Sequence, residues 1–137
     1  MNPPLRLLFV CVENANRSQM AEAFARELGG DAVEAWSAGS RPAERVGAGS
    51  VAAMAELGLD LSGARPKSLD ELPPGPWDAV VTMGCGDACP HLPAHRRDDW
   101  ALPDPRTLGP DAVRTVRDDI RARVAALLTE LGVGPAG

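Results

Sequence analysis

Residues 5–28 carry the pattern that most limits what this chain can fold into: an apolar run, a short loop and a helical repeat follow one another without a break. Residues 5–10 are largely apolar and predict a buried strand. Residues 19–28 place their apolar side chains three and four positions apart, which predicts a helix with one buried face. A strand that leads straight into a helix is the basic unit of an α/β fold.

The rest of the chain continues this alternation. Further strands are predicted at residues 32–37 and 77–83, with residues 59–61 as either a short strand or an extended link. Further helices are predicted at residues 45–57 and 110–131, with a single helical turn at 68–72 and a long loop at 84–105. This pattern indicates a parallel sheet with helices on both faces, whose ligands bind beyond the carboxyl ends of the strands. On the last helix, four residues lie off the apolar seam and are expected on a solvated face: Arg114, Arg117, Arg121 and Arg123.

Length and charge narrow the class of protein. The 137 residues suffice for one domain with its own core, so residues 1–137 are expected to form a single domain. A net charge of −5 argues against a general nucleic-acid binder. No segment is long and apolar enough to cross a membrane, and residues 1–4 lack the basic start of a secretory leader. We therefore expect a cytoplasmic monomer without a nucleic-acid or membrane partner.

The loop between the first strand and the first helix has the spacing of an oxyanion site. Cys11 and Arg17 bracket it in a Cys-x5-Arg-Ser pattern. Backbone N–H groups at such a junction point into one concavity, and the helix dipole adds positive potential there. Arg17 can hold two oxygens of a tetrahedral anion, and the same potential favours the thiolate of Cys11 as a nucleophile. The residues expected to bind the anion are Val12, Glu13, Asn14, Ala15, Asn16, Arg17 and Ser18.

Two further cysteines, Cys85 and Cys89, lie in the predicted loop after the strand at 77–83, and three interpretations of them stay open. One helical turn would place their Cα atoms about 6 Å apart, close enough for a disulfide. With His91 and His95 they have a Cys-x3-Cys-x-His-x3-His spacing that could hold zinc, although structural zinc sites usually take their ligand pairs from separate elements. They could also be ordinary half-buried cysteines. Their place beyond a strand that should neighbour the first favours the redox interpretation.

Asp104, which Pro105 follows, is the candidate general acid. An oxygen that leaves the anion needs a proton, and a carboxyl group above the loop can supply it. By itself an Asp-Pro pair is usually only a turn, so this role depends on the loop and the cysteines around it.

These segments together resemble the arsenate reductases of the low-molecular-weight protein tyrosine phosphatase fold, of the thioredoxin-coupled type. The similarity covers nearly the whole chain, at residues 11–19, 36–39 and 80–83, Cys89-Pro90, Trp100 and Asp104-Pro105. It implies three layers, with a four-stranded parallel sheet flanked by helices, and no bound cofactor. Some members of the family bind potassium near the loop, but Arg65 and Lys67 occupy that neighbourhood here, so we expect no metal.

The resemblance implies a relay of thiol steps that reduces arsenate to arsenite, as in arsenic detoxification. Cys11 attacks the arsenic of arsenate held by the loop and Arg17, and Asp104 protonates the departing oxygen. Cys85 then attacks the Cys11 sulfur and releases arsenite, and Cys89 takes over the disulfide. An external reductant, thioredoxin or a small thiol such as mycothiol, would restore the enzyme. Phosphate or sulfate would mimic the substrate.

Departures from the family pattern bear on the donor and on the loop. Only three residues separate Cys85 from Cys89, fewer than in the best-known thioredoxin-coupled members, so the donor stays open. Glu13 places a negative charge in the anion loop and is expected to point outward. Asn16 stands where small residues are common, and we expect the loop to accept it because asparagine tolerates a left-handed backbone.

Two other functions use the same loop. In a phosphomonoester phosphatase, such as a low-molecular-weight protein tyrosine phosphatase, Cys11 would attack phosphorus and water would complete the reaction. The chain has no tyrosine to frame a phosphotyrosine pocket, and the other two cysteines would have no role. A non-catalytic oxyanion sensor would keep its function after Cys11→Ser.

Overall fold

The computed structural model describes residues 3–84 and 92–133 of the chain. Its sheet consists of β1 (Leu5–Cys11), β2 (Val33–Gly39), β3 (Trp77–Thr82) and β4 (Ala94–Asp99). The strands pair in the order β2–β1–β3–β4, and every pairing is parallel. The predicted four-stranded parallel sheet is therefore confirmed.

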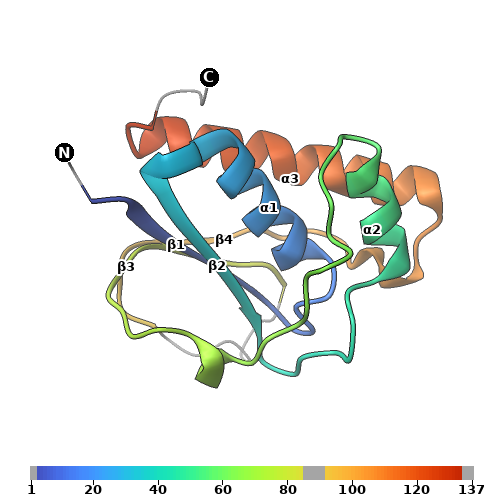
Figure 1. Ribbon diagram of the computed structural model, residues 1–137, viewed down its shortest axis with the longest axis horizontal. Helices are drawn as coiled ribbons and strands as arrows, with labels where there is room; N and C mark the ends of the chain where they lie inside the picture. Colours follow the sequence, from blue (N-terminus) through green and yellow to red (C-terminus); the bar gives the residue numbers. More distant parts are fainter. Residues whose placement is uncertain (1–2, 85–91, 134–137) are drawn as a thin grey trace.

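The two longest described helices cover one face of this sheet. Helices α1 (Arg17–Gly29) and α3 (Pro110–Glu130) run side by side over it, and α2 (Ala48–Ala55) packs against α3 (Figure 1). Apolar side chains of β1, α1 and α3, such as those of Phe9 and Ile120, meet between the layers in the larger core cluster. This burial is what holds α1, and hence the loop before it, in place.

The opposite face has a smaller core and a thinner cover. Because successive strand residues point to opposite faces, Leu8 and Val10 of β1 lie here with Trp77 of β3. Leu69, from the one-turn helix η2 (Leu69–Glu71), packs against them. Both faces are thus covered, but within the described residues α1, α2 and α3 pack on the first face and the one-turn η2 is the helix that packs on this one. Helix η2 confirms the helical turn expected at residues 68–72.

Strand β4 lies in the segment predicted to be a loop, so that prediction is wrong for residues 94–99. The sequence of β4 is Ala-His-Arg-Arg-Asp-Asp, which has no apolar alternation. The strand pairs only with β3, at the edge of the sheet, and charged residues are typical of edges because they discourage pairing with another chain. Arg96 also bonds Asp98 (3.0 Å) and lies 3.4 Å from Glu130 of α3.

Two helical predictions need correction, and the segment at 59–61 is settled. Helix α2 spans Ala48–Ala55 rather than residues 45–57, and residues 59–61 form no strand. Arg117 does not lie on a solvated face, because it is only 7% exposed. Its guanidinium donates to the Ala53 carbonyl oxygen (2.8 Å) and bonds Glu56 (2.7 Å), so it connects α3 to the end of α2.

The register of the strands brings three strand ends together. Val10 lies opposite Thr82, and the Met83 N–H donates to the Val10 carbonyl oxygen (2.8 Å). On the other side of β1, Cys11 lies opposite Gly39 at the end of β2. The segments that leave β1, β2 and β3 therefore share one edge of the sheet, which is where parallel sheets bind ligands.

Candidate active site

The anion loop, residues 11–18, joins β1 to α1 and turns at Asn14. Asn14 has a φ of 51° and is the only non-glycine residue with positive φ within residues 3–84 and 92–133. Asparagine tolerates this conformation better than most residues. Asn16 does not use that tolerance: its φ is −135°, and it is the N-cap residue of α1. The Asn16 side chain instead accepts a hydrogen bond from the Ser50 hydroxyl of α2 (2.6 Å).

The buried side chain of Asn14 sets the hydrogen bonds around the nucleophile. Its Oδ1 accepts from the Lys67 backbone N–H (2.9 Å) and from the Gln19 amide (3.1 Å). Since a backbone N–H can only donate, the other end of the Asn14 amide is the nitrogen, and it donates to the Ser18 hydroxyl oxygen (2.7 Å). The Ser18 hydroxyl proton is then available to Sγ of Cys11, which lies 2.8 Å away and, as a thiolate, can only accept. A donor at that position stabilises a thiolate.

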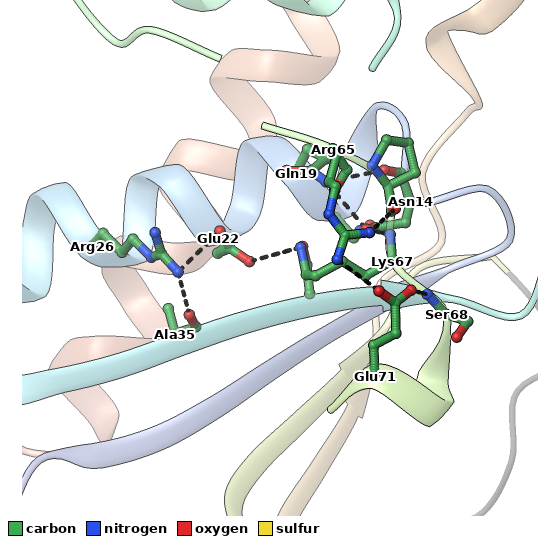
Figure 2. A network of polar contacts seen from close by, with 12 residues as sticks. Asn14, Gln19, Glu22, Arg26, Ala35, Arg65, Lys67, Ser68 and Glu71 are labelled. Atoms are coloured by element: carbon green, nitrogen blue, oxygen red, sulfur yellow. Dashed lines mark hydrogen bonds and ion pairs between the residues drawn. The ribbon is translucent and has the colours of Figure 1, made fainter. Parts of the chain in front are cut away.

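Lys67 extends this network to helix α1 and strand β2 (Figure 2). Its Nζ lies 3.9 Å from Oε1 of Glu22, and the same oxygen accepts a hydrogen bond from the Ser37 hydroxyl (2.9 Å). The other carboxylate oxygen of Glu22 lies 3.3 Å from the Arg26 guanidinium. Burial lowers the pKa of the Lys67 ammonium, and this desolvation outweighs the attraction of Glu22.

The segment after β2 fixes the other edge of the anion loop. Three N–H groups of residues 40–43 donate to the carbonyl oxygens of residues 11–13, at 2.8 to 3.3 Å. A Cβ at Gly39 would stand 2.6 Å from the Val12 carbonyl oxygen and 2.9 Å from the Asn14 nitrogen. Only glycine allows the two segments to approach this closely.

Arg17, the first residue of α1, holds its guanidinium between two other segments, with its side chain 8% exposed. One terminal nitrogen donates to the Leu102 carbonyl oxygen (3.1 Å), and the other lies 3.9 Å from the Asp104 carboxylate. Gly84 is close on a third side, where a Cβ would stand 2.5 Å from Nη1 of Arg17. The planar fork is thus oriented by contacts that leave little freedom.

An open cleft of about 710 Å³ lies over the loop. The Glu13 side chain is 31% exposed and lines this cleft, and its carboxylate lies 3.3 Å from the Arg106 guanidinium of η4 (Pro105–Thr107). The Arg106 N–H donates to the Asp104 carboxylate (3.0 Å), which holds Asp104 at the same cleft. The cleft is lined by Val12, Glu13, Arg17, Arg41, Pro42, Ala43, Gly84, Asp104 and Arg106.

The structure places Arg17 and Asp104 at the cleft, while Cys11 is 2% exposed at the end of β1 and is not among the residues that line the cleft. The catalytic roles of these three residues stay predictions. Cys85, Cys89 and His91 lie outside the described residues, so the disulfide, the zinc site and the half-buried cysteines stay untested. His95 is exposed on β4. Within the two described ranges, no group of three or more His, Cys, Asp or Glu side chains could hold a metal ion.

Six residues of this site were not identified as site residues from the sequence: Gln19, Arg41, Pro42, Ala43, Gly84 and Arg106. Gln19 directly follows the Cys-x5-Arg-Ser pattern and Arg106 follows the Asp-Pro pair, so adjacency to those motifs is a usable signal. Gly84 and residues 41–43 reach the cleft through the packing of the chain, and no pattern beside them in the sequence indicates it. The family resemblance had placed Lys67 near the loop, but only as a residue that argues against a potassium site.

Comparison with known proteins extends these observations. A family profile described as "Low molecular weight phosphotyrosine protein phosphatase" matches residues 6–134. A protein of Halobacterium salinarum whose name refers to arsenate reductase is 45% identical over 132 residues, which cover 89% of each chain. The glutaredoxin arsenate reductase of Synechocystis sp. is 33% identical over 129 residues, covering 92% of this chain and 98% of that protein.

Solved structures give the same result in three dimensions. "An arsenate reductase in the phosphate binding state" superposes with a TM-score of 0.82 at 32% identity, covering 92% of this chain and 98% of that one. The thioredoxin-dependent arsenate reductase of Corynebacterium glutamicum superposes with a TM-score of 0.78 at 34% identity. That match covers 96% of this chain and 63% of the other.

Proposed function

Because this chain belongs to the low molecular weight phosphotyrosine protein phosphatase family, and several relatives of similar length are named arsenate reductases, we propose that it reduces arsenate to arsenite. Electrons would come from its own cysteines and an external thiol, without a bound cofactor. The same anion loop would bind phosphate or sulfate as mimics of the substrate, in keeping with the relative solved in the phosphate binding state.

One observation carries this proposal over plain hydrolysis: the cleft is lined both by the anion loop that begins at Cys11 and by Gly84, the residue that precedes Cys85 in the sequence. The anion loop leaves β1 at Cys11, and its residues Val12 and Glu13 line the cleft. Gly84 lines it too, two residues beyond the end of β3, and Cys85 is the next residue of the sequence. A phosphatase would need only the first of these segments.

The first chemical step would form a bond between sulfur and arsenic. The Cys11 thiolate attacks arsenic in arsenate, with the Ser18 hydroxyl supporting the thiolate until then. Arg17 holds two oxygens of the anion, and its charge balances the charge that gathers on them. The As–O bond to the leaving oxygen breaks, and Asp104 supplies the proton that lets it depart as water or hydroxide.

The following steps would transfer electrons between sulfurs. Cys85 as a thiolate attacks Sγ of Cys11, and the electron pair of the breaking S–As bond stays on arsenic, which leaves as arsenite. Cys89 attacks Cys85, which frees the Cys11 thiolate and leaves a Cys85–Cys89 disulfide. A dithiol reductant, or two equivalents of a small thiol, then reduces that disulfide with two electrons.

The donor would be thioredoxin or a small-thiol system. The printed names of the relatives support both, since one is a glutaredoxin arsenate reductase and another is thioredoxin-dependent. We also infer a cytoplasmic location, since such relays need reducing surroundings. The monomeric state stays a prediction. None of the helices in the described part of the chain could span a membrane.

The test is an arsenate reduction assay supplied in parallel with thioredoxin, with glutaredoxin and glutathione, and with mycothiol. We expect arsenite formation in at least one arm, and a Cys85→Ser variant that accumulates an arsenic adduct on Cys11, detectable by mass spectrometry. Steady-state turnover in Cys85→Ser equal to that of the unmodified protein would overturn the relay. Hydrolysis of 4-nitrophenyl phosphate without arsenate reduction in any arm would favour the phosphatase.

A further inference from the structure

Lys67 occupies an unusual position for a lysine, because its side chain is 17% exposed and none of the catalytic steps uses it. Lysine is seldom buried without a partner, since burial of an ammonium costs free energy that only a nearby opposite charge offsets. The partner here is Glu22 of α1, whose side chain is 11% exposed. The charges that act on the ammonium besides Glu22 are Arg26, Arg65 and Glu71.

Through its backbone, the same residue touches the anion loop. The Lys67 N–H donates to Oδ1 of Asn14 (2.9 Å), and its carbonyl oxygen accepts from the Gly39 N–H at the end of β2 (2.8 Å). The Arg65 carbonyl oxygen two residues earlier accepts from the Gln19 amide (3.1 Å). Residues 65–68 are thus a strap that touches the loop with its backbone and reaches α1 with the Lys67 side chain (Figure 2).

We propose that Lys67 is a positioning residue for Cys11: its ammonium holds residues 65–68 against α1, so that its own N–H keeps the Asn14 amide turned toward Ser18. The chain of contacts is continuous, from Glu22 through Lys67, Asn14 and Ser18 to the sulfur. Every link is a hydrogen bond or a charge contact of groups that are largely buried. Loss of the ammonium would let the strap relax away from α1, and the hydroxyl proton of Ser18 would then be aimed less well at the sulfur.

This inference deepens the proposed function, since it assumes that Cys11 is the reactive sulfur. Its test does not need arsenate turnover. The readout is the rate at which iodoacetamide alkylates Cys11 at neutral pH, located by mass spectrometry of the Cys11 peptide. A second readout is the phosphate concentration that halves this rate, which reports the affinity of the anion loop for an oxyanion.

The variants are Lys67→Met, Lys67→Arg and the matched control Arg65→Met. We expect Lys67→Met to slow alkylation by about fivefold, which is the usual size of effect for the loss of one partly buried contact. We also expect it to raise the phosphate concentration that halves the alkylation rate. Lys67→Arg keeps the charge and should restore most of the rate. Arg65→Met should stay within about twofold of the unmodified protein, because the Arg65 side chain is 69% exposed and its carbonyl bond to Gln19 survives.

Equal rates for Lys67→Met and Arg65→Met would overturn the proposal, as would a failure of Lys67→Arg to restore the rate. If Lys67→Met does not fold, Glu22→Gln removes the same attraction while the Ser37 hydroxyl keeps an acceptor, and it should slow alkylation in the same direction. In a variant that carries both Lys67→Met and Glu22→Gln, the fold-decrease in alkylation rate should be smaller than the product of the two single fold-decreases, because both changes break the same contact. If the two fold-decreases multiply in the double variant, Lys67 and Glu22 do not act through one contact, and the proposal is contradicted. If the unmodified protein reduces no arsenate, the alkylation series still decides the role of Lys67.

Discussion

Two polar networks of this molecule use similar side chains in different surroundings. Within the anion loop and directly after it, Asn14, Ser18 and Gln19 are at most 1% exposed, and their hydrogen bonds join one another, the backbone and Cys11. Between α2 and α3, the Glu56 carboxylate bonds Arg114 (2.8 Å) and Arg117 (2.7 Å), and its side chain is 42% exposed. One network is sealed in protein, and the other meets solvent.

The difference teaches which network can control chemistry. In the sealed network no water replaces a lost partner, so removing one member leaves the others unsatisfied and moves the group that they position. In the second network Arg117 is buried, but the Glu56 carboxylate and Arg114 are exposed, so water takes over when a bond between these two breaks, and the change in free energy is small. We therefore expect changes near the anion loop to alter reactivity, and changes between α2 and α3 to alter stability alone.

The largest effect is expected for Cys11→Ser, which should lower arsenate turnover by at least about 10⁴-fold, because a serine hydroxyl at this position is a far weaker nucleophile than a thiolate. The fold should survive, since the substitution changes one atom of a buried side chain. Turnover and the thermal melting temperature are to be measured on the same preparation. A variant that is folded and active would remove the anion loop from the chemistry altogether.

Arg17→Lys tests whether geometry or charge matters at the cleft. Lysine keeps the positive charge but loses the planar fork and its bond to the Leu102 carbonyl oxygen. We expect kcat/KM for arsenate to fall by about 10²-fold, the usual cost of a lost oxyanion contact. A fall of less than about threefold would mean that a point charge suffices there.

Gly84→Ala and Gly132→Ala form a matched pair that separates backbone strain from contact with Arg17. Both glycines have a φ of 85°, so alanine should lower the free energy of unfolding by about 1 kcal/mol at either position. Only at Gly84 would the new Cβ meet the Arg17 guanidinium, while nothing lies within 4 Å at Gly132. We expect phosphate affinity to weaken in Gly84→Ala and to stay unchanged in Gly132→Ala, measured by protection of Cys11 from alkylation. Equal affinities in both variants would show that Arg17 tolerates the displacement.

The smallest effect is expected for Glu56→Gln, which should change only the pH dependence of stability. Hydrogen bonds from Arg114 and then Arg117 lower the pKa of Glu56 from 4.5 to about 2. Because the folded state lowers this pKa, the contribution to stability is present above about pH 4.5 and is lost as the pH falls toward 2. Glu56→Gln should therefore narrow the gap in urea midpoint between pH 7 and pH 3, with kcat unchanged. Glu130→Gln, on the weaker contact to Arg96, serves as the control.

Sequence reasoning succeeded where a residue pattern and a local structure coincide. The apolar run at residues 5–10, the spacing of Cys11 and Arg17 and the helical seam of α3 each depend on neighbours along the chain, and each appears as predicted. The family resemblance supplied the number of strands. Asp104 was predicted beside the loop, and the structure places it there at 3.9 Å from Arg17.

Prediction from the sequence failed where a residue's structure depends on a contact with a residue far away along the chain. Strand β4 is held by the backbone of β3 and has no apolar signal of its own. Arg117 has the spacing of a solvated residue, but α2 lies against it. Asn14 and Asn16 are equally able to take a left-handed turn, and only the contacts to Lys67 and Gln19 select Asn14.

The Asn14 turn also bears on how an arsenate reductase could work in a cell rich in phosphate. Protein groups hold the curvature of the loop, so a tetrahedral anion of either element would meet the same rigid set of donors. Arsenate and phosphate are so alike in size and charge that such a loop would bind them with nearly equal affinity. Selectivity for arsenate over phosphate would then arise after the anion is bound. Arsenic can keep the electron pair of its bond to sulfur and so be reduced, whereas phosphorus cannot. Phosphate would act as a reversible competitor, and resistance to arsenic would depend on the ratio of the two anions around the cell.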